Sequence, residues 1–86
     1  MKILCFAIDI QNDFMNQDGK LYVKNAELIK PQLKQLTQLI FDYNLQTIYT
    51  TDVHCSEDKE ISATPDFKTT FPEHCIIGTQ GAACRF

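Results

Sequence analysis

The strongest constraint on the fold is a nearly continuous apolar run, residues 2–9 (KILCFAID), that closes on polar residues. An unbroken apolar run of this length is typical of a strand buried on both faces, as in a parallel sheet. A helix is the competing interpretation, but the run is short. Asp9, Gln11, Asn12 and Asp13 crowd its end. Ligands bind at the carboxyl ends of strands in open α/β sheets, so these residues are candidates for a site, with turn and capping chemistry as the alternative.

An amphipathic segment follows, in which apolar residues recur at intervals of three and four. This spacing predicts a helix with one stripe facing the core. The stripe consists of Ile29, Leu33, Leu36, Ile40 and Tyr43, with Leu39 beside them. Proline is costly inside a helix, so the main helix is predicted to begin near Pro31, after a short turn over residues 26–30, and to stop at Asn44. Residues 16–19 (NQDG) predict an earlier turn in which Gly19 supplies a positive φ.

A second apolar-rich run, residues 45–51 (LQTIYTT), predicts another strand after the helix. Strand, helix and strand make a βαβ unit, whose two strands are parallel. The predicted fold class is therefore α/β. Because parallel strands have their carboxyl ends at one edge of the sheet, Asp9 should lie near Asp52 and His54, which follow the second strand.

The residues after the second strand suggest a metal site. Asp52 and His54 are two positions apart, and side chains with that spacing on an extended backbone point the same way. His74 could return to the same spot after a polar loop. Carboxylate and imidazole suit a borderline divalent ion, zinc foremost, with iron or manganese as alternatives. An ordinary loop histidine with its hydrogen bonds satisfied is the competing interpretation for each imidazole.

The charge, the apolar runs and the cysteine spacing argue against nucleic-acid binding, a membrane span and disulfide bonds. A net charge of -3 with scattered basic residues argues against a nucleic-acid surface. No apolar run approaches the ~18 residues of a membrane helix, and the first run ends at Asp9 without a cleavage site, so we expect a cytoplasmic protein with no membrane partner. The four cysteines lack C-x-x-C spacing and are expected to be reduced. Structural zinc at the adjacent pairs His54-Cys55 and His74-Cys75 is disfavoured, because neighbouring side chains point apart.

Several motifs occur together along nearly the whole chain. They are residues 8–14 (IDIQNDF), 51–54 (TDVH), Ser62, 65–67 (PDF), 71–75 (FPEHC) and 78–82 (GTQGA). In order and spacing they resemble the isochorismatase-like cysteine hydrolases, and within them the nicotinamidases. The resemblance implies a Rossmann-like three-layer α/β/α fold with a parallel sheet. Residues 1–86 would supply a βαβ unit and a metal loop, as the N-terminal part of an incomplete domain.

The resemblance also implies roles for individual residues. Asp9 resembles the acid/base member of a Cys-Asp-Lys triad, which takes the proton of a nucleophilic thiol and passes it to the leaving amine. Asp52, His54 and His74 match the metal ligands of nicotinamidases, and Glu60 stands where the family places a further histidine or glutamate. Family members that act on isochorismate lack this ion site. The implied activity is therefore hydrolysis of nicotinamide or a related small amide.

Phe14 and Phe71 match aromatic positions that flank the substrate ring, with ordinary core packing as the alternative. Many nicotinamidases have tryptophan in place of Phe71, which leaves the substrate open. The family's lysine and nucleophilic cysteine would lie beyond residue 86, and none of the four cysteines here matches the nucleophile's context. We therefore expect residues 1–86 alone to be inactive.

Two further hypotheses remain. The chain could be a non-catalytic remnant that keeps metal binding or pairs with a longer relative. An unrelated βαβ binding module would need a glycine loop after the first strand, and residues 9–13 contain no glycine. A small amide is the expected partner, and a homo-oligomer is left open.

Overall fold

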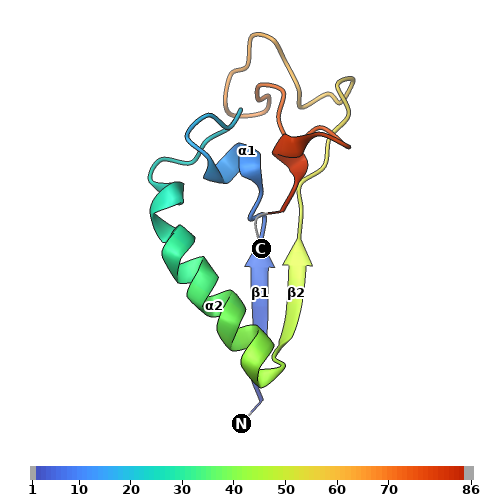
Figure 1. Ribbon diagram of the computed structural model, residues 1–86. Helices are drawn as coiled ribbons and strands as arrows, with labels where there is room; N and C mark the ends of the chain where they lie inside the picture. Colours follow the sequence, from blue (N-terminus) through green and yellow to red (C-terminus); the bar gives the residue numbers. More distant parts are fainter. Residues whose placement is uncertain (1, 85–86) are drawn as a thin grey trace.

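The computed structural model describes residues 2–84, in which two parallel strands run beside one long helix (Figure 1). The elements in chain order are β1 (Leu4–Ile8), α1 (Asn12–Met15), the 3-10 helix η1 (Ala26–Ile29), α2 (Lys30–Tyr43), β2 (Gln46–Thr50) and the 3-10 helix η2 (Gln80–Ala82). The strands pair in parallel, from Leu4 opposite Gln46 to Ile8 opposite Thr50. The predicted βαβ unit is confirmed. Both strands end at the same end of the molecule, where α1 and the loops gather (Figure 1).

The boundaries of α2 follow from its sequence. Pro31 lies in the first turn, where its missing N–H is no loss, and η1 precedes the helix as the predicted short turn. Asn44 adopts a left-handed backbone with φ of 49° and caps the last carbonyl groups of the helix, those of Ile40 and Phe41. Asparagine tolerates this conformation, so both predicted ends are confirmed.

The apolar stripe of α2 is covered only in its middle. Leu33, Leu36 and Ile40 are half-buried, whereas Ile29 and Tyr43 are 44% and 71% exposed. The prediction that the whole stripe belongs to the core was wrong at its two ends and at Leu39, which is 48% exposed. A 14-residue helix is ~21 Å long, and the five-residue strands beside it are ~17 Å long, so the ends of the stripe have less to pack against.

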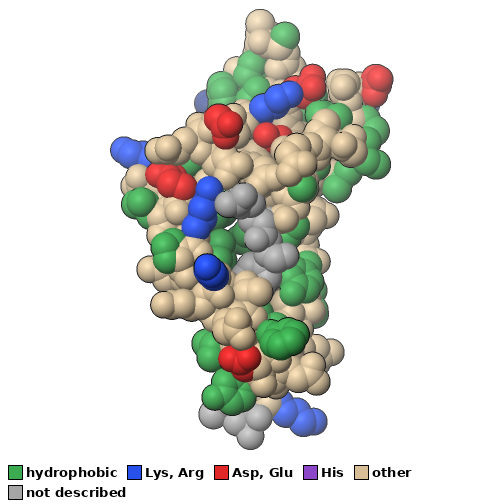
Figure 2. Space-filling model, viewed as in Figure 1, with side chains coloured by type: hydrophobic (Ala, Val, Ile, Leu, Met, Phe, Trp, Pro, Cys, Tyr) green, Lys and Arg blue, Asp and Glu red, His purple; other side chains and the backbone are tan. Residues whose placement is uncertain are grey.

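The strand β1 is less covered than its apolar sequence predicts. Leu4, Phe6 and Ile8, alternate residues that share one face, are all exposed, whereas Ala7 on the other face is buried. The expectation of burial on both faces was therefore wrong within this chain, because two strands and one long helix supply too few side chains to cover both faces. Figure 2 shows hydrophobic side chains at the surface of the half that holds the strands and α2. The Cα radius of gyration is 14.8 Å, above the ~12 Å of an ordinary domain of this length.

The best-buried part of the described chain is polar and lies beyond the carboxyl ends of the strands. Its buried polar side chains are those of Gln11, Asn12, Asp13, His54 and His74, and its buried apolar ones are those of Met15 and Cys75. Ala7, within β1, is also buried. Within residues 2–84, every buried side-chain nitrogen or oxygen has a hydrogen-bond partner. No helix in that range is long and apolar enough to cross a membrane. The centre of the molecule is thus a satisfied polar network.

The turn at residues 16–19 forms as predicted, but its glycine has another reason. The N–H of Gly19 donates to the carbonyl of Asn16 at 2.8 Å. The prediction of a positive φ at Gly19 was wrong, since Gly78 is the described glycine with that conformation. A Cβ at Gly19 would instead overlap the carbonyl oxygen of Asp13. Glycine is needed there because two backbone segments approach closely.

Candidate functional site

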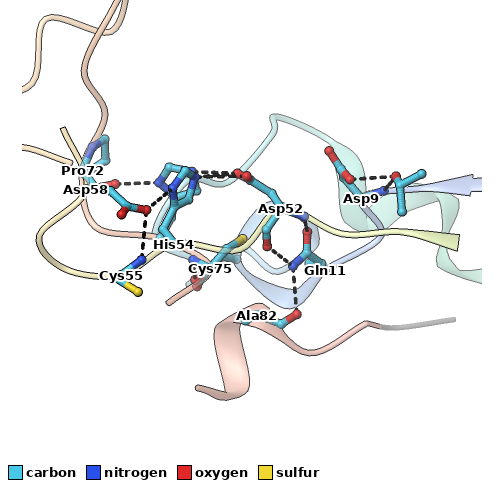
Figure 3. A network of polar contacts seen from close by, with 12 residues as sticks. Asp9, Gln11, Asp52, His54, Cys55, Asp58, Pro72, Cys75 and Ala82 are labelled. Atoms are coloured by element: carbon cyan, nitrogen blue, oxygen red, sulfur yellow. Dashed lines mark hydrogen bonds and ion pairs between the residues drawn. The ribbon is translucent and has the colours of Figure 1, made fainter. Parts of the chain in front are cut away.

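Asp52, His54 and His74 meet just beyond the end of β2 (Figure 3). The Nε2 atom of His54 lies 3.0 Å from Oδ1 of Asp52, and Nε2 of His74 lies 3.1 Å from Oδ2 of the same carboxylate. One ligand atom from each residue can be chosen so that all lie within 4.8 Å of one another. Both imidazole rings are buried, and the carboxylate is partly exposed. Three groups that can ligate a metal thus converge on one small volume.

Backbone pairing explains how His74 returns to Asp52. The chain continues past β2, and His54 forms a parallel bridge with Ile76. Its N–H donates to the carbonyl of Cys75 at 3.0 Å, and its own carbonyl accepts from the N–H of Ile77 at 2.9 Å. This short ladder places residues 74–77 alongside the extension of β2, and so brings the two histidines together.

The second nitrogen of each imidazole has an acceptor. Nδ1 of His54 lies 3.1 Å from a carboxylate oxygen of Asp58, and Nδ1 of His74 lies 2.7 Å from the carbonyl oxygen of Pro72. An ionised carboxylate and a carbonyl can only accept, so they favour the hydrogen on each Nδ1, while the carboxylate of Asp52 competes for it at each Nε2. In the Nδ1–H tautomer both Nε2 lone pairs face the carboxylate of Asp52. The lone pairs of two imidazoles and one carboxylate that face each other repel unless a cation or a proton lies between them. This set of donor atoms therefore fits a borderline divalent ion.

The electrostatics of His54 agree with this geometry. Burial of the ring lowers its pKa, but hydrogen bonds to Asp58 and Asp52 outweigh burial, and the pKa of His54 is raised above 6.5. The charge of Glu60 acts in the same direction. Glu60 is itself exposed and is not among the three converging residues. The structure therefore brings its charge near His54 without adding its carboxylate to the cluster.

Asp9 lies at the same edge of the sheet, directly after β1 (Figure 3). Thr50, the last residue of β2, orients it: its hydroxyl donates to Oδ1 of Asp9 at 2.8 Å, and the N–H of Asp9 donates to the Thr50 carbonyl at 3.1 Å. Asp9 has a φ of 54°, a left-handed conformation that is uncommon for any residue with a side chain. Such conformations cluster at functional sites, where the surrounding structure enforces them.

An apolar cavity of about 470 Å³ adjoins Asp9, and Ile10, Phe14 and Val23 are among its other lining residues. The ring of Phe14 lies 5.7 Å from that of His74, measured between centroids. Phe71 lies 6.3 Å from the same imidazole. Both predicted aromatic residues therefore flank a histidine of the cluster.

Gln11 has a role that the sequence did not reveal. Its side chain is fully buried and holds the backbone of Asp52 in both directions (Figure 3). Its Nε2 donates to the carbonyls of Asp52 and Ala82 at 2.8 and 2.9 Å, and its Oε1 accepts from the N–H of Asp52 at 2.8 Å. The clustering of polar residues after β1 indicated a site there, but not this clamp.

Two carboxylates also have unforeseen structural roles. Asp13 is buried, and its Oδ2 accepts from the N–H of Cys75 at 2.7 Å, which ties α1 to the segment that carries His74. Asp58 contacts His54 from a turn that begins at Cys55. In the sequence, Asp58 follows the candidate ligand His54 by four residues. That spacing indicates a contact only if the chain turns between them, and no sequence signal predicted the turn.

Cys75 adjoins the cluster but is not suited to nucleophilic attack. Its side chain is fully buried. Burial, reinforced by the negative charges of Asp13, Asp52 and Asp9, raises the pKa of the Cys75 thiol to about 12. Because the thiolate is the reactive form, this cysteine stays inert at neutral pH.

The chain is similar to nicotinamidases and pyrazinamidases of known sequence or structure. No family model matches the chain. It is 32% identical over 75 residues to the nicotinamidase/pyrazinamidase of Mycobacterium tuberculosis, a match that covers 87% of the chain and 39% of that protein. The nicotinamidase/pyrazinamidase of Bacillus subtilis superposes with a TM-score of 0.78 at 29% identity, covering 100% of the chain and 45% of that structure. The pyrazinamidase of Pyrococcus horikoshii also superposes with a TM-score of 0.78, at 23% identity, and the match covers 95% of the chain and 44% of that structure.

The chain thus spans less than half the length of these relatives. Over that span the parallel βαβ unit superposes on the Bacillus subtilis structure, which confirms the predicted Rossmann-like α/β fold. In sequence and in fold the chain is nicotinamidase-like. Its motifs had predicted this branch of the isochorismatase-like cysteine hydrolases.

Proposed function

We propose that this chain carries the metal-binding and acid/base part of a hydrolase that cleaves small amides of the nicotinamide class. The observation that carries the proposal is the convergence of Asp52, His54 and His74 at the sheet edge that also holds Asp9. The similarity to nicotinamidases supports the substrate class.

Asp52, His54 and His74 would hold the ion, with Glu60 as a further candidate ligand. Zinc is the first choice for two imidazoles and a carboxylate, and the pyrazinamidase of Pyrococcus horikoshii was solved in complex with zinc. Iron or manganese would also suit these donors. When bound, the ion supplies a positive charge that can hold a ring nitrogen or a water molecule.

Asp9 would act as the acid/base residue. Its carboxylate, oriented by the Thr50 hydroxyl, would accept the proton of a nucleophilic thiol and return it to the departing amine. Phe14 and Phe71 would bound the substrate ring, and the open apolar pocket beside Asp9 would offer it an apolar surface.

The nucleophile is the part that residues 1–86 do not supply in this proposal. Cys75 is buried and protonated, Cys5 lies within β1, and Cys55 and Cys84 are exposed. We infer that the chain by itself binds metal and substrate without hydrolysing the amide. Release of ammonia from nicotinamide by the purified 86-residue chain would overturn this inference.

A zinc titration of the purified chain tests the metal site, with His54→Ala and His74→Ala as the informative variants and Asp42→Asn, on the exposed side of α2, as the control. Each histidine variant should lose most of the zinc affinity, and the control should keep it. Equal affinity in all four proteins would refute the site.

A ligand comparison tests the substrate class. Nicotinamide and benzamide differ in the ring nitrogen alone, so the zinc-loaded chain should bind nicotinamide more tightly in ligand-observed NMR. Equal binding of the two amides would contradict a role for the ion in holding the ring.

A second candidate function is that of a non-catalytic remnant that retains metal binding or pairs with a longer relative. The exposed face of β1 favours it, because Leu4, Phe6 and Ile8 offer apolar surface to another chain. Native mass spectrometry of the purified chain mixed with a full-length nicotinamidase tests the pairing: the absence of a mixed complex would argue against it.

A further inference from the structure

We propose that Asp58 is a positioning residue that fixes the ring orientation and tautomer of His54 for metal binding. This inference rests on the proposed metal site and adds to it a residue outside the three converging ligands. Oδ2 of Asp58 lies 3.1 Å from Nδ1 of His54, on the side of the ring opposite Asp52 (Figure 3).

The first step concerns how Asp58 is itself held. Its N–H donates to the carbonyl of Cys55 at 3.0 Å, and the N–H of Cys55 donates to Oδ2 of Asp58 at 3.0 Å. The residues from 55 to 58 therefore close a turn by two hydrogen bonds. The same carboxylate oxygen that closes the turn also faces the imidazole, so the turn determines where that oxygen lies.

The second step concerns the ring. A carboxylate only accepts, so Asp58 and Asp52 compete for the hydrogen of a neutral His54. Asp58 favours the tautomer with the hydrogen on Nδ1, which leaves the Nε2 lone pair directed at the metal site. Without Asp58, the hydrogen could move to Nε2 and donate to Asp52. That tautomer would place a hydrogen where a metal ion has to bind. Metal-ligating histidines generally carry such an outer partner, and a carboxylate also raises the basicity of the ligand.

The third step is a contrast with His74. Its Nδ1 faces the neutral carbonyl of Pro72 at 2.7 Å, so the acceptor that favours its Nδ1–H tautomer belongs to the backbone. Only His54 depends on a side chain for this purpose, and a substitution can therefore remove the partner of one ring and leave the other intact.

The experiment compares zinc affinity, by competition with a chromophoric chelator, in the full 86-residue chain and three variants. Asp58→Ala removes the acceptor, and we expect a roughly ten- to hundred-fold loss of affinity. Asp58→Asn keeps an oxygen that can accept from the Cys55 N–H and from Nδ1–H of His54, so it should recover part of the lost zinc affinity. Glu57→Ala removes an exposed carboxylate from the same turn, and screening by solvent should keep its affinity within about twofold of wild type.

A second measurement separates positioning from mere stabilisation of the turn. Nitrogen-15 NMR of the metal-free chain, at a pH above the raised pKa of His54, reports which ring nitrogen carries the hydrogen. We expect Nδ1–H for both histidines in the wild type, and a shift toward Nε2–H at His54 alone in Asp58→Ala.

The outcomes distinguish the two proposals. A wild-type chain that binds no zinc would refute the proposed metal site, while the NMR measurement would still decide the role of Asp58. Zinc binding that is equal in wild type and Asp58→Ala, or a tautomer of His54 that does not change, would overturn the inference about Asp58.

Discussion

Replacing Gln11 with alanine would remove the clamp between the two halves of the buried polar network. The substitution leaves three backbone groups without their partner: the N–H and carbonyl of Asp52 and the carbonyl of Ala82. Each hydrogen bond contributes ~1 kcal/mol net, so the loss should be ~3 kcal/mol, and a water molecule that enters the vacated space would reduce it to ~2 kcal/mol. This is a large share of the stability of a domain of 86 residues.

Urea-induced unfolding, followed by circular dichroism, measures the change in the free energy of unfolding. Gln38→Ala is the matched control, because Gln38 also makes a side-chain hydrogen bond, to Asp42, but on the exposed surface of α2. It should cost no more than ~0.5 kcal/mol. If Gln11→Ala and Gln38→Ala destabilise the chain equally, the clamp does not have the role assigned to it.

Three further predictions follow from the site and its surroundings. Iodoacetamide at pH 8 should modify the exposed Cys55 but not Cys75, whose pKa is raised to about 12; peptide mass spectrometry that finds Cys75 labelled in the folded chain would contradict its burial. Zinc binding requires a neutral His54, whose pKa is raised, so on acidification the affinity should begin to fall at a higher pH than it would for an unperturbed histidine; a pH-independent affinity would refute this. Gly19→Ala should destabilise the chain by ~2 kcal/mol or more, because its Cβ would overlap the Asp13 carbonyl; an unchanged melting temperature would show that the two segments can separate freely.

The sequence predicted the fold where the apolar periodicity was strong and where particular residues mark the start and end of a helix. The apolar runs and the Pro31 and Asn44 signals gave the βαβ unit and the ends of α2. Parallel pairing then explained why Asp9 and Asp52 share an edge, since that conclusion needs only the direction of the strands.

The rest depends on tertiary contacts that carry no local pattern. Gln11 acts on residues 41 and 71 positions away, and no spacing rule predicts such partners. Asp58 required a turn whose closure is visible only in three dimensions. The exposure of Ile29 and Tyr43 reflects how little sheet lies beside α2, which helical periodicity cannot report.

The long-range character of the polar centre has a consequence for folding kinetics. The bonds that build it join Gln11 to Ala82 and Asp13 to Cys75, pairs that are 71 and 62 positions apart. The chain must bring its two ends together before these bonds form, and the conformational entropy of closing such long loops slows folding. The ion-binding groups should therefore assemble last. In stopped-flow refolding, helix formation should precede the ability to capture zinc, and simultaneous phases would contradict that order.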